Sequence, residues 1–115
     1  MNKILIKRKP CDNKCPLRIV MHRFGDKWSI LIIQILSEEN ILRFGELLSK
    51  IDGISLKVFS STLKMLEKYG FISRKVYPEV PPKVEYKLTK LGQDILPYIE
   101  KISTWAENNI KRKKE

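Results

Sequence analysis

The hydrophobic period of this chain changes from 3.6 to 2 near Phe71, and this change constrains the fold more than any other feature. Residues 71–77 and 83–88 both alternate between apolar and polar side chains, a pattern typical of strands with one buried face. The residues between them, 78–82, include three prolines that stiffen the connection. The sequence therefore predicts two antiparallel strands joined by a proline-stiffened loop.

Two helices are expected before this ribbon, near the start of the chain. Pro16 stands where a helix favours its first residue and Gly25 breaks the pattern, so a short helix is predicted over residues 16–23. Its inward-facing residues would be Leu17, Val20 and Met21. Asp26 is placed to cap a second helix over residues 27–37, which is apolar on nearly every face and is therefore expected to be buried.

A short strand and two more helices are expected next. Residues 41–43 are compatible with a stub of strand. The next helical stripe consists of Phe44, Leu47, Leu48 and Ile51. Asp52-Gly53 signals a tight turn, after which Ser55 is placed to cap a helix that Gly70 ends. The buried stripe of that helix would be Leu56, Phe59, Leu63 and Leu66, and its opposite side would carry Lys57, Ser61, Lys64 and Lys68.

The C-terminal part of the chain predicts one long helix of about twenty residues, capped by Thr89. Its broad apolar face exceeds what such a small core can cover, so we expect a dimer surface, with packing on its own domain as the alternative. The expected dimer residues are Leu17, Ile95, Tyr98, Ile99, Ile102 and Trp105.

This order of elements predicts a winged helix-turn-helix, which is mainly α with a small β-hairpin wing. We expect a basic N-terminal segment at residues 1–14, the winged helix-turn-helix domain with its dimerisation helices at 15–109, and a basic tail at 110–115. An α-helix fits the major groove of B-DNA, and a ribbon can lie along the neighbouring backbone or minor groove.

The charge agrees with a nucleic-acid partner, although an anionic membrane surface or an acidic protein would also suit it. The formal net charge is +10, from 23 Lys+Arg against 13 Asp+Glu. The helix at 55–69 would read DNA, and the ribbon would add cations, including Lys87. The expected DNA-binding residues are Arg43, Ser55, Lys57, Ser60, Ser61, Lys64, Arg74, Lys75 and Lys83.

Over residues 15–106 the sequence closely resembles HxlR-type winged helix-turn-helix transcriptional regulators. The motifs that carry the resemblance are Gly25-Asp-Lys-Trp-Ser-Ile-Leu31, Arg43-Phe-Gly-Glu-Leu47, Gly53-Ile-Ser55, Tyr77-Pro-Glu-Val-Pro-Pro-Lys-Val-Glu-Tyr86 and Leu88-Thr-Lys-Leu-Gly92. The resemblance implies a homodimer, held by N- and C-terminal helices, that binds a pseudo-palindromic operator. It places residues 55–64 in the major groove and Lys83 at the basic position of the wing. Ser61-Thr62 departs from the Gln-Arg pair common in this family, so no operator sequence carries over.

Cys15 matches a cysteine through which some members of this family sense electrophiles or oxidants. A helix N-terminus and nearby Lys14 and Arg18 favour its thiolate, and Cys11 is placed to serve as a resolving partner. The alternative is a half-buried cysteine acting as a small apolar residue. Cys11, Cys15 and His22 do not make a convincing zinc site, and no metal or cofactor is expected.

The sequence thus predicts a sequence-specific DNA-binding transcriptional regulator that acts on double-stranded DNA as a homodimer. The alternative is a non-specific DNA-binding or protein-interaction winged-helix module. We expect no enzyme, because no plausible catalytic set is found. The longest apolar stretch, residues 28–36, is too short to span a membrane, so a cytoplasmic protein without a membrane partner is expected. A small-molecule or electrophile effector stays open.

Overall fold

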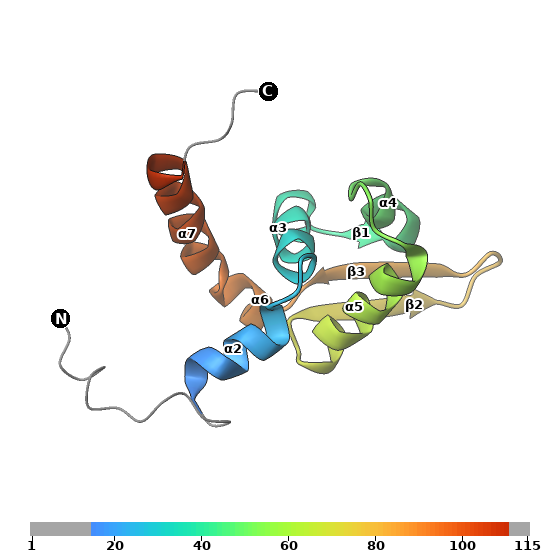
Figure 1. The fold of residues 1–115 in the computed structure, drawn as a ribbon. Coiled ribbons are helices and arrows are strands. Elements are labelled where there is room, and N and C mark those ends of the chain that lie inside the picture. The colour runs from blue at the N-terminus through green and yellow to red at the C-terminus, as the bar shows by residue number, and fades with distance from the viewer. Residues whose placement is uncertain (1–14, 111–115) are drawn as a thin grey trace.

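The computed structural model describes residues 15–110, which form a mainly helical body with a small antiparallel sheet (Figure 1). The fold class expected from the sequence is confirmed. The elements are α2 (Pro16–Phe24), α3 (Ser29–Glu39), β1 (Leu42–Arg43), α4 (Phe44–Ser49), α5 (Leu56–Lys68), β2 (Ile72–Tyr77), β3 (Lys83–Leu88), α6 (Lys90–Asp94) and α7 (Leu96–Asn109). Among the described helices, none has both the length and the apolar character needed to cross a membrane.

The predicted ribbon is present, and the short strand before α4 joins it. The strand order is β1-β3-β2, and both pairings are antiparallel. In the register of β2 with β3, Ile72 lies opposite Leu88 and Tyr77 lies opposite Lys83. The far end of β2 and β3 extends away from the helices as a wing (Figure 1).

The core forms around α3, as its apolar sequence predicts. Ile32, Ile33 and Leu36 of this helix are almost completely buried, and they share one cluster with Phe59 and Leu66 of α5. The start of α3 is capped by the Asp26 carboxylate, which accepts hydrogen bonds from the backbone N–H groups of Trp28 and Ser29 at 2.9 Å. The helix itself begins at Ser29, two residues later than expected.

The predicted ends of α5 are also confirmed. The Ser55 hydroxyl oxygen accepts a hydrogen bond from the Val58 N–H at 3.1 Å. At the other end Gly70 adopts a φ of +86°, and the Phe71 N–H donates to the Leu66 carbonyl at 2.9 Å. This geometry satisfies the last carbonyls of the helix and favours glycine at the left-handed position.

The prediction that Leu56 belongs to the buried stripe of α5 is wrong. Leu56 is 59% exposed, because the first turn of the helix extends beyond the core and all of residues 55–58 are exposed. Thr62 is buried instead, and its hydroxyl donates to the Val58 carbonyl at 2.7 Å. This bond removes the cost of burying the threonine oxygen.

The inward face predicted for α2 is also wrong for the single chain. Leu17, Val20 and Met21 are exposed, and Phe24 is the buried residue of this helix. The reason is that α2 meets the body through its C-terminal end, where the Phe24 ring lies 4.6 Å from the ring of Phe71. The apolar residues of the earlier turns therefore find no partner within the described chain.

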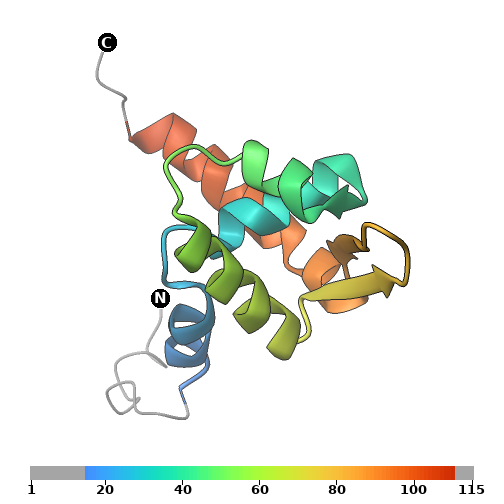
Figure 2. The same ribbon diagram turned by 90° about the vertical axis from the view of Figure 1, so that its right-hand side faces the viewer.

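The single C-terminal helix expected from the sequence is divided into α6 and α7. Pro97 has no N–H to donate to the carbonyl of Gln93, and its ring conflicts with a continuous helix at that carbonyl. The Gln93 carbonyl instead accepts from the Ile95 N–H, which ends α6. After this break α7 leaves the body on the side opposite the wing, as α2 does (Figure 1), and Figure 2 shows the molecule from its wing side.

α6 is held firmly on the turn between α5 and β2. The Thr89 N–H donates to the Phe71 carbonyl at 3.1 Å, and the Thr89 hydroxyl donates to the Gly70 carbonyl. The backbone at Gly92 comes so close that a Cβ atom there would lie 2.2 Å from the Phe71 carbonyl oxygen. A residue with a side chain at Gly92 would therefore force the two segments apart.

Candidate nucleic-acid interface

The exposed side of α5 is the first part of the candidate interface. Lys57, Ser61, Lys64 and Lys68 are all exposed on it. The spacing of three to four residues places them along one stripe of the helix, opposite the buried side. The Ser61 hydroxyl donates to the Val58 carbonyl at 3.0 Å, which leaves its oxygen as an acceptor toward solvent.

The second part is a groove of about 270 Å³ between α5 and the inner face of the wing. Ser60 and Lys64 enter this groove from α5, and Arg74 enters it from β2. Residues far apart in the sequence are thus brought together as two cations and a hydroxyl. Such groups are the usual protein partners of phosphate oxygens.

Glu67 lines the same groove and was not among the residues expected from the sequence. It stands three residues after Lys64, so the helical period was a signal that could have placed it there. Its carboxylate sets a limit to the groove, because a phosphate next to Glu67 would meet a like charge.

The two basic residues of β2 lie on different faces of the wing. Adjacent strand residues alternate, so Arg74 faces α5 while Lys75 lies on the outer face. The outer face also carries Tyr77, Lys83 and Glu85 (Figure 1 shows the ribbon). The sequence set therefore divides into an inner and an outer group.

The outer group is tied together by side-chain contacts. The Tyr77 hydroxyl donates to Glu85 Oε1 at 3.0 Å, and Lys83 Nζ lies 3.5 Å from Glu85 Oε2. The Lys75 and Lys83 ammonium groups lie 5.0 and 4.6 Å from the centre of the Tyr77 ring. Tyr77 and Glu85 were missed as site residues, although strand alternation puts both on the face of the two lysines.

Arg43 lies at the junction of β1 and α4 and is exposed. Its backbone N–H donates to Glu46 Oε1 at 2.8 Å, which stabilises the first turn of α4. Its position in β1 is directly opposite Glu85 in β3. Arg43 thus extends the outer group of the wing toward the body.

Cys15 lies half-buried directly before α2, at the position that the sequence predicts, and it takes part in a disulfide. Cys11, the expected resolving cysteine, and Lys14 lie outside the described residues. α2 is packed on the end of α5, where the Arg23 guanidinium carbon lies 4.4 Å from the centre of the Tyr69 ring. The helix that follows Cys15 is therefore in direct contact with the C-terminal end of α5.

The expected dimer residues differ in their exposure. Ile99 is buried within the chain and Ile95 is half-buried. The others are 57–66% exposed, namely Leu17, Tyr98, Ile102 and Trp105. They belong to α2 and α7, the two helices that lie on the side opposite the wing (Figure 1).

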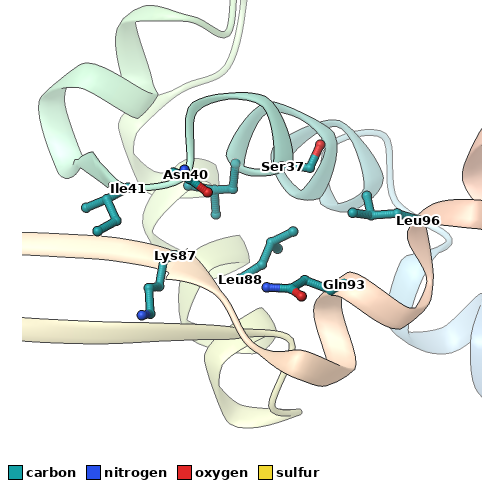
Figure 3. A pocket seen from close by; sticks show the side chains of 8 residues that line it. Ser37, Asn40, Ile41, Lys87, Leu88, Gln93 and Leu96 are labelled. Carbon is teal, nitrogen blue, oxygen red and sulfur yellow. The ribbon is translucent and has the colours of Figure 1, made fainter.

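A further pocket of about 540 Å³ lies where the ends of α3 and β3 meet α6 and α7 (Figure 3). Its apolar lining includes Leu36, Leu88 and Leu96, and its polar lining includes Gln93 and Asn40. Asn40 adopts a φ of +70°, uncommon for a residue other than glycine, and the next N–H donates to the Glu39 carbonyl at 2.9 Å. The pocket is separate from the α5 groove, and sequence reasoning did not identify it.

One family model matches most of this chain. Residues 23–114 match the family described as HxlR-like helix-turn-helix. An uncharacterized HTH-type transcriptional regulator from Halalkalibacterium halodurans is 43% identical over 94 residues, which cover 82% of this chain and 83% of that protein.

Similar solved structures are also those of transcriptional regulators. A transcriptional regulator from Porphyromonas gingivalis W83, described as of the MarR family, is 46% identical with a TM-score of 0.79, and the match covers 90% of this chain and all of that chain. The redox regulator HypR in its oxidized form is 32% identical with a TM-score of 0.72, over 85% of this chain and 100% of that chain.

Proposed function

Since this chain belongs to the HxlR-like helix-turn-helix family of DNA-binding transcriptional regulators, we propose that it binds a pseudo-palindromic operator as a homodimer. One observation carries the proposal: the groove between α5 and the wing brings Ser60, Lys64 and Arg74 together. A helix in the major groove and a ribbon beside it would then grip the same stretch of backbone. The exposed stripe of α5 would supply the contacts to base edges.

The apolar sides of α2 and α7 support the homodimer. They leave Leu17, Tyr98, Ile102 and Trp105 in solvent, and a second copy of the chain would cover them. A twofold dimer has two reading helices, which must stand about 34–36 Å apart to enter successive major grooves. Any change in the dimer that alters this separation weakens both contacts together.

Cys15 would make the regulator responsive to oxidants. HypR, a similar protein, is a redox regulator, and Cys15 stands before a helix that packs on the reading helix through Arg23 and Tyr69. The reduced thiols of Cys15 and Cys11 would form a disulfide, giving two electrons and two protons to an oxidant such as diamide. A shift of α2 on this reaction would reach α5 through the ring contact.

The test of the proposed function is fluorescence anisotropy of the reduced protein with its own upstream DNA and with a scrambled duplex, across a range of salt concentrations. We expect binding to the upstream DNA to be tighter by on the order of 10³, with a salt slope worth several phosphates. Equal binding to both duplexes would favour a non-specific DNA binder. Absence of binding to either at low salt would favour a protein-interaction module.

The redox step has its own test. We expect diamide to change the upstream-DNA affinity of the wild-type protein and to leave that of Cys15→Ser unchanged, because the variant has one cysteine and no internal disulfide. Reversal of the wild-type change by dithiothreitol is the control. A Cys15→Ser protein that stays equally sensitive to diamide would exclude Cys15 as the sensor.

A further inference from the structure

Glu85 is the one acidic residue among the outer-face residues of the wing strands β2 and β3. In the sheet register it lies opposite Lys75 on one side and opposite Arg43 on the other. Along its own strand, two residues away in each direction, stand Lys83 and Lys87. A carboxylate at the centre of four cations opposes the approach of a DNA phosphate, so its presence on this face needs a reason.

The contacts of Glu85 supply that reason. One carboxylate oxygen accepts from the Tyr77 hydroxyl at 3.0 Å, and the other lies 3.5 Å from Lys83 Nζ. The side chains of Lys83 and Glu85 are 26% and 21% exposed, whereas those of the ion pair Lys50–Glu39 are 40% and 44% exposed. The wing pair is therefore more withdrawn from water than this surface pair, and the hydrogen bond from Tyr77 also holds its carboxylate.

The Tyr77 ring extends this arrangement to the other strand. It lies 5.0 Å from the Lys75 ammonium and 4.6 Å from that of Lys83, and both are within the range of cation–π attraction. Tyr77 and Lys83 face each other at the last pair before the loop. Because Glu85 fixes the tyrosine hydroxyl and one lysine, it fixes the site at which both lysines meet one ring.

We propose that Glu85 is a positioning residue of the wing, which holds Tyr77 and Lys83 so that the lysines meet the DNA backbone in one ordered arrangement. The inference rests on the proposed DNA-binding function. It means that an acidic residue promotes binding although its own charge opposes it. Two flexible lysine side chains ordered before binding lose less entropy when they contact phosphates.

The substitution Glu85→Gln tests this role, because the two explanations predict opposite changes in affinity for the upstream DNA. If the carboxylate only repels DNA, its removal tightens binding and frees Lys83, so the salt slope steepens by about 0.9 for one added phosphate contact. If Glu85 positions the lysines, affinity for the upstream DNA falls by about threefold to tenfold and the salt slope becomes shallower, because Lys83 loses its fixed place. Anisotropy titrations across salt measure both quantities.

Glu79→Gln is the matched control, because Glu79 is an exposed acid in the same wing and the charge change is identical. We expect this control to bind as tightly as the wild type or more tightly. Tyr77→Phe keeps the ring and removes the hydroxyl, and we expect it to weaken binding in the same direction as Glu85→Gln. In a Lys83→Ala background, Glu85→Gln should weaken binding less than it does in the wild type, since one of the two residues that Glu85 positions is absent.

The outcomes distinguish the positioning role of Glu85 from the proposed DNA-binding function. Glu85→Gln binding as tightly as Glu79→Gln, or more tightly, overturns the positioning role while the regulator function stands. A wild-type protein that binds neither duplex overturns the proposed function and this inference with it. Thermal melts of each variant are run alongside, and if Glu85→Gln melts below the assay temperature, Tyr77→Phe decides the question.

Discussion

The two ends of this molecule differ in how many contacts their exposed polar and apolar side chains make within the chain. At the wing, Tyr77, Lys83 and Glu85 contact one another within the chain. At the other end, α2 and α7 leave large apolar side chains in solvent, with Ile102 64% exposed and Trp105 57% exposed. The charged side chains of the wing are held by contacts within one chain. We infer that the exposed apolar side chains of α2 and α7 are covered by a second copy of the chain.

The largest effect should follow from breaking the apolar end while the charged end stays intact. Ile102→Asp places a carboxylate on the exposed face of α7, so we expect a monomer in size-exclusion chromatography with light scattering. A monomer lacks the second DNA-binding helix that the dimer would bring to the same operator. Upstream-DNA binding should therefore weaken by on the order of 10².

The control for this prediction is Thr104→Asp, which adds the same charge at an exposed position on a different side of α7. It should stay dimeric and keep its affinity. Because Ile102 is exposed, the free energy of unfolding of the isolated chain should hardly change in Ile102→Asp. A dimeric Ile102→Asp protein would contradict the assignment of this face.

A smaller effect should follow from the converse change at the charged end. Lys64→Ala removes one cation of the groove between α5 and the wing, and we expect upstream-DNA affinity to fall by about tenfold with a salt slope lower by about 1. The dimer should be unaffected. Lys90→Ala removes the same charge from α6, where Lys90 pairs with Asp94 at 2.8 Å, and should leave binding unchanged; equal losses in the two variants would show that only net charge matters.

The smallest expected effect is on stability at the start of α5. Ser55→Ala removes the oxygen that accepts the Val58 N–H, and it should lower the free energy of unfolding by about 1 kcal/mol. Urea denaturation measures this change. Ser55→Asp keeps an acceptor at the cap and should retain most of the stability, so equal losses in both variants would mean that the cap bond contributes little.

Much of the fold could be predicted because its signals are local. The cap at Ser55, the glycine at position 70 and the alternation of the two strands each act within a few residues, and all three appear where expected. The predicted burial of Leu56 was wrong because the apolar stripe of α5 continues beyond the end of the core. The prediction of one continuous C-terminal helix was wrong because Pro97 breaks the helix although the apolar period continues through it.

The candidate site was less predictable, for a different physical reason. Sequence reasoning selected cations and serines, and Ser60, Lys64 and Arg74 are brought together across two elements. It missed Tyr77, Glu85 and Glu67, because residues that organise or limit a basic surface carry no charge or the wrong sign. Their roles appear only when strand register and helix packing set them beside the lysines.

The break between α6 and α7 has a mechanical consequence. α6 is fixed to the turn after α5 by Thr89 and by the close approach at Gly92, and the break near Ile95 sets the direction in which α7 leaves the body. Ile99 holds that direction by packing in the core, so α7 forms an arm of fixed orientation. With 14 residues, the arm is about 21 Å long. A difference of about 10° in the direction of α7 would displace its far end by about 3.6 Å, close to the 3.4 Å rise of one base pair. If two such arms join two copies, the angle at one proline-defined joint sets which base pairs the two copies can reach together.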